Sequence, residues 1–181
     1  THDRLGRQFT AESSARSHTF TYNDDLQLAT ETIVGNGLTN TITRSYDSLG
    51  RSSGFSLGDD YAMVYSYDAF GRFSSVSNLA FLASLAVQYS YLPSSDLLSG
   101  YTESASGLTV SRTYEDHRNL LISVVNSLDS TTLSQYDYLN DAGARRTSVK
   151  HSGTAFLDPM FTLWGYNTRS ELTAANRFWG T

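Results

Sequence analysis

The sequence predicts an all-β fold, an antiparallel meander of repeated β-hairpins that forms a curved ribbon. Two observations lead to this prediction. A tyrosine-led turn recurs along the chain at steps of 20 to 28 residues, and the segments that enter the turns alternate between two sets of side chains. A repeat of this length is typical of an array in which each unit buries its apolar face against its neighbours. We therefore expect one array over residues 1–181.

The turn is most regular at two places in the first half of the chain. These are Tyr46-Asp47-Ser48-Leu49-Gly50-Arg51 and Tyr67-Asp68-Ala69-Phe70-Gly71-Arg72. Looser copies begin at His2, Tyr22, Tyr91, Tyr114, Tyr138 and Tyr166, which gives about eight repeats.

The segments beside the turns have the period of a β-strand. In 61–67, Tyr61, Met63, Tyr65 and Tyr67 share one face. The same alternation holds in 108–114, in 119–125 and in 160–166, with β-branched and aromatic residues throughout. Period two with these residue types predicts strands.

The turn has a physical mechanism that explains its residues. The aspartate side chain accepts hydrogen bonds from the backbone N–H groups that follow it, and a glycine takes the positive-φ position that closes a type I turn with a bulge. Gly6, Gly50, Gly71 and Gly143 fit that position. A second, polar reversal follows each outgoing strand, at 35–37, 57–60, 104–107 and 151–153. Each repeat is therefore a hairpin, and the array should contain about sixteen strands.

Residues 79–87 fit this pattern least well. By propensity, Leu79 to Ala86 could form a helical turn. The hairpins on both sides favour a buried strand or a strand junction instead.

Composition narrows the class of protein. The chain has 27 serines, 20 threonines and 12 tyrosines among 181 residues, with only 17% charged residues against roughly 25% in ordinary domains. It has no cysteine and a formal net charge of −5, with one lysine, so it lacks the basic surface that nucleic-acid binding needs. It also lacks an apolar run of the ~18 residues that a membrane span needs. The first residues do not read as a signal peptide, and we expect the chain to be a piece of a longer protein.

These turns resemble the RHS or YD-repeat family, named for a pattern close to Tyr-Asp-x-x-Gly-Arg-Leu. Tyr46 to Arg51 and Tyr67 to Arg72 carry the pattern nearly intact, and His2 to Arg7 keeps all but the tyrosine. Tyr166 to Leu172 looks like the variant in which Glu-Leu ends the turn. The resemblance covers essentially the whole chain.

The resemblance implies a sheet ribbon that spirals into a hollow shell. In bacterial insecticidal and polymorphic toxins such shells enclose a toxic C-terminal domain, and in animal teneurins a related barrel displays adhesion surfaces. It thus implies a secreted or cell-surface bacterial protein, whose partners are the remaining repeats and a C-terminal cargo domain. Self-cleavage by an aspartyl core segment is not carried over, because Asp158-Pro159 stands without the surrounding pattern.

Candidate chemistry in the sequence has simpler structural explanations. Gly54-Phe55-Ser56-Leu57-Gly58 matches the Gly-x-Ser-x-Gly nucleophile elbow, but a repeat turn precedes it and another strand follows it. The four histidines fall in different repeats, and neither Asp24-Asp25 nor Asp59-Asp60 has a calcium-loop pattern. We expect no catalytic residue, no metal site and no cofactor.

The remaining conspicuous residues are given structural roles. Asp47, Asp68 and Asp116 serve their own turns, and Arg7, Arg51, Arg72 and Arg145 lie over tyrosine rings or pair with aspartates of neighbouring repeats. We expect the stripe of Tyr65, Tyr67, Tyr89, Tyr91, Tyr114, Tyr136 and Tyr138 to form a cross-strand ladder whose hydroxyls reach solvent. A sugar-binding platform is the alternative.

The favoured function is therefore a non-catalytic shell segment that encloses or presents a toxin or effector domain. About sixteen strands at ~4.8 Å span only ~75 Å, too little to enclose even a 100-residue cargo, so the chain is a section of a wall. The alternative is an extracellular module that binds carbohydrate or protein through its aromatic face. An open meander also has two unpaired edges, and we expect self-association through them.

Overall fold

The computed structural model describes residues 1–79 and 86–180. In these residues every element of regular secondary structure is a β-strand, which confirms the predicted all-β meander of antiparallel hairpins. The described residues form fifteen strands, one fewer than the sixteen expected. The chain divides into two compact units, Thr1–Ala86 and Val87–Thr181. The single array over 1–181 and the curvature of its ribbon stay predictions.

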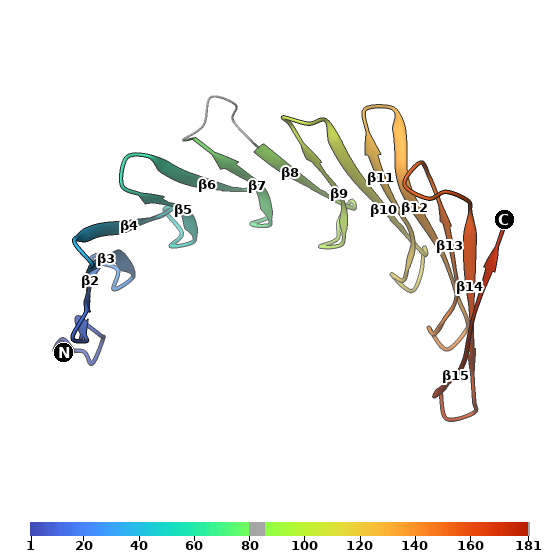
Figure 1. The fold of residues 1–181 in the computed structure, drawn as a ribbon, viewed down its shortest axis with the longest axis horizontal. Helices are drawn as coiled ribbons and strands as arrows, with labels where there is room; N and C mark the ends of the chain where they lie inside the picture. Colours follow the sequence, from blue (N-terminus) through green and yellow to red (C-terminus); the bar gives the residue numbers. More distant parts are fainter. Residues whose placement is uncertain (80–85, 181) are drawn as a thin grey trace. The chain divides into compact units, whose positions relative to one another are not determined.

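The first unit is a meander of seven strands that pair in chain order (Figure 1). They are β1 (Thr10–Glu12), β2 (Arg16–Tyr22), β3 (Leu28–Gly35), β4 (Leu38–Tyr46), β5 (Ser52–Leu57), β6 (Tyr61–Tyr67) and β7 (Phe73–Asn78). Every neighbouring pair is antiparallel.

The second unit repeats the arrangement. Its strands are β8 (Ala86–Tyr91), β9 (Leu98–Glu103), β10 (Leu108–Tyr114), β11 (Leu121–Leu128), β12 (Thr131–Asn140), β13 (Arg146–Ser152), β14 (Met160–Tyr166) and β15 (Leu172–Trp179). Consecutive strands again pair antiparallel. The predicted strand or helical turn at 79–87 falls mostly on residues 80–85, outside the described ones, and Ala86 and Val87 begin β8.

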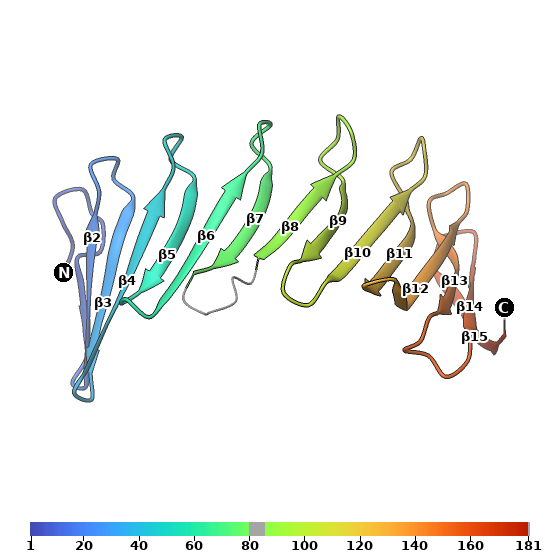
Figure 2. The same cartoon turned by 90° about the horizontal axis from the view of Figure 1, so that it is seen from above.

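Each repeat places its two kinds of reversal at opposite ends of the strands. Within each unit the tyrosine-led turns follow the even-numbered strands and lie at one end of the strands. The polar reversals lie at the other end (Figure 2). The register shifts by one residue as the chain enters each turn, for example between Ser45 and Tyr46 and between Ser66 and Tyr67. These shifts are the bulges that the turn chemistry predicted.

Within each unit the sheet is a single layer. Among the described residues only two apolar side chains are buried, Val110 and Val149. The other apolar side chains are half-buried against their cross-strand neighbours or exposed, as at Leu139 and Leu163. Stability therefore comes from contacts between adjacent strands rather than from a central core. No helix long and apolar enough to cross a membrane occurs in the described ranges.

Candidate functional site

The most highly organised part of the molecule is the series of tyrosine-led turns, which we call the turn ladder. It comprises the turns at 3–7, 23–27, 47–51, 68–72, 92–97, 115–120, 141–145 and 167–171, with the residue that enters each of them.

The turn at 47–51 shows the geometry of a complete copy. The Asp47 carbonyl accepts from Gly50 N–H at 2.9 Å, and Asp47 N–H donates to the Arg51 carbonyl at 2.9 Å. Oδ1 of Asp47 accepts from the N–H groups of Leu49 and Arg51, each at 2.9 Å. Oδ2 accepts from Arg51 Nε at 2.7 Å. One carboxylate thus accepts hydrogen bonds from two backbone N–H groups and from one guanidinium. The bonds from the backbone N–H groups were predicted from the sequence.

The same pattern recurs with few changes. The turns that begin at Asp3, Asp68 and Asp141 repeat every one of these side-chain bonds at 2.7 to 2.9 Å. In the turns at 23–27 and 167–171 an asparagine, Asn23 or Asn167, takes the place of the aspartate. Asp116 does not have the predicted role. The acidic residue that begins this turn is its neighbour Glu115, which forms an ion pair with Arg118.

Gly6, Gly50 and Gly71 have φ of 79°, 77° and 83°, as the turn requires. The prediction was wrong for Gly143. In that turn Ala144 occupies the left-handed position, with φ of 62°, and its N–H donates to the Asp141 carbonyl at 3.0 Å. Gly143 is one residue too early, because the turn is counted from Asp141.

Tyr138 was likewise assigned to the wrong place. The register shift in β12 lies between Leu139 and Asn140, so Asn140 is the residue that enters the turn. Tyr138 lies two residues earlier, with the guanidinium carbon of Arg146 3.7 Å from its ring centroid. The Asp-x-x-x-Arg spacing of 141–145, shared with the other complete copies, would have located the turn where tyrosine spacing did not.

Adjacent repeats are joined by one recurrent hydrogen bond. The hydroxyl of the tyrosine that enters a turn donates to the backbone carbonyl of the first residue after the preceding turn, and we call this bond a rung. Rungs join Tyr22 to Gln8, Tyr46 to Leu28, Tyr67 to Ser52, Tyr114 to Leu98 and Tyr166 to Arg146, at 2.8 or 2.9 Å. Asn140, which enters its turn in place of a tyrosine, makes the equivalent contact. Its Nδ2 donates to the carbonyl of Leu121 over a longer distance of 3.5 Å.

The rungs are contacts that the prediction for the tyrosine stripe did not include. Of the stripe tyrosines, Tyr67 and Tyr114 donate their hydroxyls to carbonyls of the preceding repeat. Each rung gives a buried or half-buried ring a polar partner in the preceding repeat and so ties the two repeats together.

The turn arginines join the same ladder. Each pairs with the aspartate of its own turn, not of a neighbouring repeat as predicted, as at Arg7–Asp3 and Arg72–Asp68. The other predicted arrangement is confirmed for the arginines at 7, 51 and 145. Their guanidinium carbons lie over the tyrosine that enters the next turn, 4.1 to 5.0 Å from the ring centroid. The guanidinium therefore serves two repeats at once, because its edge donates to the carboxylate and its face covers the ring.

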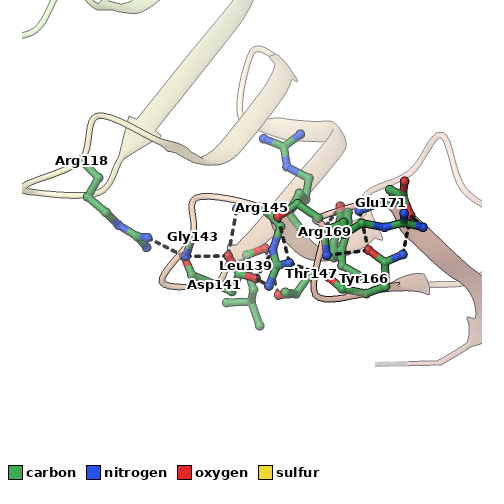
Figure 3. A network of polar contacts seen from close by, with 12 residues as sticks. Arg118, Leu139, Asp141, Gly143, Arg145, Thr147, Tyr166, Arg169 and Glu171 are labelled. Carbon is green, nitrogen blue, oxygen red and sulfur yellow. Dashed lines mark hydrogen bonds and ion pairs between the residues drawn. The ribbon is translucent and has the colours of Figure 1, made fainter.

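Where the regular arginine contact is missing, other donors cross between turns. Nε2 of Gln27 donates to the Gly50 carbonyl at 2.7 Å. Figure 3 shows the second unit, where Arg118 donates to the carbonyl of Asp141. Arg145 has the regular contact and also reaches the next turn, where its Nη1 lies 3.4 Å from the carbonyl oxygen of Asn167. Sequence reasoning missed Gln27 and Arg118 because neither stands in a complete copy of the motif.

The electrostatics of the turns favour ionised aspartates. Partial desolvation raises the pKa of Asp47, but hydrogen bonds from Arg51 and Leu49 outweigh it and bring the pKa below its ordinary value. At Asp141 the side-chain hydrogen bond from Arg145 is the main cause of the same lowering of the pKa. The charged form is therefore the one that the fold stabilises.

The aromatic stripe contains cross-strand pairs, as predicted, but the partner ring is not always a tyrosine. Tyr89 and Tyr101 do face each other across β8 and β9, with ring centroids 5.9 Å apart. Other rings meet partners of another kind, such as Tyr65 with Phe73 at 5.7 Å and Tyr136 with His151 at 5.1 Å. Because neighbouring rings or guanidinium groups cover many of these aromatic faces, the geometry does not favour the sugar platform.

Ser56, His18 and His151 each have their described contacts within their own unit. Ser56 lies inside β5, which leads into a hairpin rather than into the helix that a nucleophile elbow needs. His18 lies 3.3 Å from Glu31, and burial, helped by Arg177, lowers the pKa of His151. In the described part of the chain no three His, Cys, Asp or Glu side chains come together as a metal site would require.

No family model matches the sequence, and no curated protein matches it. Solved structures do share its fold. The crystal structure of TcdB2-TccC3-TEV matches with a TM-score of 0.78 and 18% identity, over 94% of this chain and 10% of that chain. A mutant structure of the Photorhabdus luminescens Tc holotoxin pore matches with a TM-score of 0.79 and 17% identity, over 96% of this chain and 10% of that chain. The chain spans about a tenth of the solved chains that it matches, and the likeness shows a common fold.

Proposed function

We propose that this chain is a non-catalytic structural segment of an RHS/YD-repeat shell, which encloses or presents a toxin or effector domain in a larger exported bacterial protein. The turn ladder carries the proposal. Its most regular side chains, the turn aspartates, arginines and tyrosines, bind their own turn or the adjacent repeat, as at Arg51, which contacts both Asp47 and Tyr67. Such groups join repeats into a wall.

Two further observations support the proposal. Within each unit the sheet is one layer thick, and large apolar side chains such as Leu139, Leu163 and Phe178 stay exposed. Exposed apolar patches in soluble proteins usually meet another surface. The likeness to chains of Tc toxin structures, of which this chain covers 10%, agrees with a short section of a long wall.

Protection of the enclosed segment tests this function. In the full polypeptide that contains this chain, limited trypsin digestion should spare the segment outside the repeats. A variant that forces adjacent strands apart, Gly54→Ala with Gly100→Ala, should expose that segment to the protease, because a methyl group at either site would meet a backbone carbonyl at 2.1 or 2.2 Å.

The matched control is Leu157→Ala, at a side chain that is 98% exposed in the loop before β14. It should leave the protection unchanged. If trypsin digests the non-repeat segment equally in the unmodified protein, the double variant and the Leu157→Ala control, the enclosing function is refuted.

A further inference from the structure

One face of the second unit changes its chemical character between β12 and β14. Residues that lie directly opposite each other on neighbouring strands share a face of the sheet. Two rows of three residues cross these strands on one face: Leu139, Ser148 and Leu163, then Asp137, Lys150 and Phe161. Leu139 and Leu163 are 66% and 44% exposed, so this face presents apolar side chains to its surroundings.

Two of these residues depart from the pattern of the repeats. Leu139 directly precedes the residue that enters its turn. The other repeats have a hydroxyl residue or glycine at that position, namely Thr1, Thr21, Ser45, Ser66, Ser90, Thr113 and Gly165. Lys150 is the fifth residue after its turn, and four other repeats have a hydroxyl residue there, namely Thr32, Ser56, Ser77 and Thr102. The array itself therefore requires neither this leucine nor this lysine.

The short side chain of Ser148 leaves a groove in this face. Leu139 on β12 and Leu163 on β14 stand on either side of it, on strands about 9.6 Å apart, which is two strand spacings. The groove has a volume of about 350 Å³ and is lined mainly by apolar atoms, including those of Phe161. This volume lies at the lower end of the range found for binding sites in proteins.

Lys150 brings one positive charge to the groove. The side chain is half-buried, and in the described part of the chain it makes no hydrogen bond or ion pair. Asp137, the carboxylate opposite, accepts instead from Ser123 Oγ at 2.8 Å and from Gln135 Nε2 at 2.9 Å. An ammonium without a partner beside apolar side chains is complementary to a carboxylate that is carried on an apolar body.

The spacing along β13 defines the shape of the occupant. Ser148 and Lys150 are two residues apart on one face of the strand, a distance of about 6.8 Å. Alternate side chains of an extended peptide have the same spacing and point to one side. An apolar side chain can therefore lie above Ser148 while the side chain two residues away reaches Lys150.

Continuation of the sheet would leave this groove open. A further strand beside β15 would pair with its edge, three strand spacings or about 14 Å from β13. The groove lies on the face of the sheet, over strands that already have both neighbours. Its occupant must therefore approach the face of the sheet rather than its edge.

We propose that the groove over β13 is a docking site for an extended acidic peptide segment. An apolar side chain of the segment lies between Leu139 and Leu163, and an aspartate or glutamate two residues away pairs with Lys150. The proposal rests on the geometry of β12 to β14 and not on the shell function. The peptide test below and the protease test of enclosure can therefore fail independently.

Peptide titration followed by two-dimensional NMR of the chain tests this chemistry. The probe is the blocked peptide Thr-Phe-Thr-Glu-Thr, and the control is Thr-Phe-Thr-Gln-Thr, which lacks only the charge. The probe should shift amide signals of β12, β13 and β14. It should bind about two- to fivefold more tightly than the control, the effect of one exposed ion pair, and added salt should reduce the difference.

Four variants of the chain separate the charge from the groove. Lys150→Gln should bind the two peptides equally, whereas Lys150→Arg should keep the preference for the probe. Ser148→Leu fills the groove and should abolish binding of both peptides. Its matched control is Ser111→Leu, at an exposed serine on the same face of β10, which should leave binding unchanged. Circular dichroism of each variant verifies that the sheet is intact.

Several results would overturn the proposal. Equal affinity of the unmodified chain for the two peptides would remove the role of Lys150, and no binding of either peptide would remove the site. If 3-phenylpropionate binds as tightly as the probe, the groove belongs to a small apolar acid rather than to a peptide. A concentration-dependent dimer, seen by sedimentation, that excludes the probe would assign the groove to a second copy of the chain.

Discussion

At the scale of single residues, this molecule uses each polar side chain of a complete turn more than once. Asp47 accepts hydrogen bonds from two backbone N–H groups and from the guanidinium of Arg51. The same guanidinium lies over the ring of Tyr67. Tyr67 in turn donates its hydroxyl to Ser52. Neighbouring repeats are thus joined through three residue types, which explains why these types recur together in the sequence.

Removing one hydroxyl oxygen measures how much a rung contributes to the free energy of unfolding. Tyr67→Phe leaves the carbonyl of Ser52 without its partner and should lower the free energy of unfolding by about 0.5–1.5 kcal/mol in urea denaturation. The control is Tyr61→Phe on the same strand, where the described contacts of the hydroxyl include no hydrogen bond and the ring keeps its contact with Phe55. If both variants lose the same stability, the rung contributes nothing.

Acid should weaken the turns. Because the folded state lowers the pKa of Asp47, Asp68 and Asp141, the folded chain binds fewer protons than the unfolded chain near pH 4. Their stabilisation is complete above the ordinary pKa of 3.8 and is lost as the pH falls through the lowered values. Urea denaturation between pH 6 and pH 3 should show this loss.

A double variant, Asp47→Asn with Asp68→Asn, is the test of that assignment. It should be less stable at pH 6 and lose less on acidification, because asparagine has no proton to gain. Asp59→Asn is the control, since the Asp59 side chain makes no hydrogen bond or ion pair in the described structure. An unchanged acid dependence in the double variant would assign the acid sensitivity to other groups.

At the scale of elements, close backbone approach decides how tightly the strands pair. Gly100 on β9 faces Ser111 on β10, and a methyl group at Gly100 would lie 2.2 Å from the Val110 carbonyl oxygen. The backbone of Gly100 is not left-handed, so its absence of a side chain serves packing alone.

Gly100→Ala should therefore separate β9 from β10. Overpacking of this kind costs about 1–3 kcal/mol, and amide hydrogen exchange should accelerate in these two strands before it does in β13 and β14. Gly165→Ala is the matched control, because its methyl group would meet Ala174 Cβ at an ordinary 3.4 Å. Equal exchange in the two variants would contradict the close approach.

At the scale of the whole molecule, each of the two compact units is an array with local contacts only. Each strand contacts the strands beside it, and the described elements show no packing of one layer on another. Stability in such an array is a sum of repeat and neighbour terms, so a part can fold without the rest.

Residues 87–181 alone should therefore keep their sheet. We expect a β-type circular dichroism spectrum and hydrogen-exchange protection in β10 to β13, where Val110 and Val149 are buried. The interior strands should be protected more strongly than β15, whose residues are mostly exposed. Loss of all protection in the isolated unit would show that its stability depends on the first unit.

The sequence by itself determined the period, the strands and the turns. Alternation in 61–67 and the Asp-x-x-Gly spacing at 47–50 are local signals, because strand pleat and turn φ angles depend on neighbouring residues. Local signals also failed where two of them disagreed. Tyr138 fitted the expected step, but the turn is counted from Asp141, and Asn140 and Ala144 took the positions assigned to Tyr138 and Gly143.

Only the tertiary structure decided which side chains meet. The rung from Tyr46 to Leu28 spans 18 residues, and the bond from Arg118 to Asp141 spans 23. Such partners depend on the register between adjacent strands, which the bulge beside each turn sets. A shift of one residue would move each side chain to the other face, so spacing along the chain could not specify these contacts.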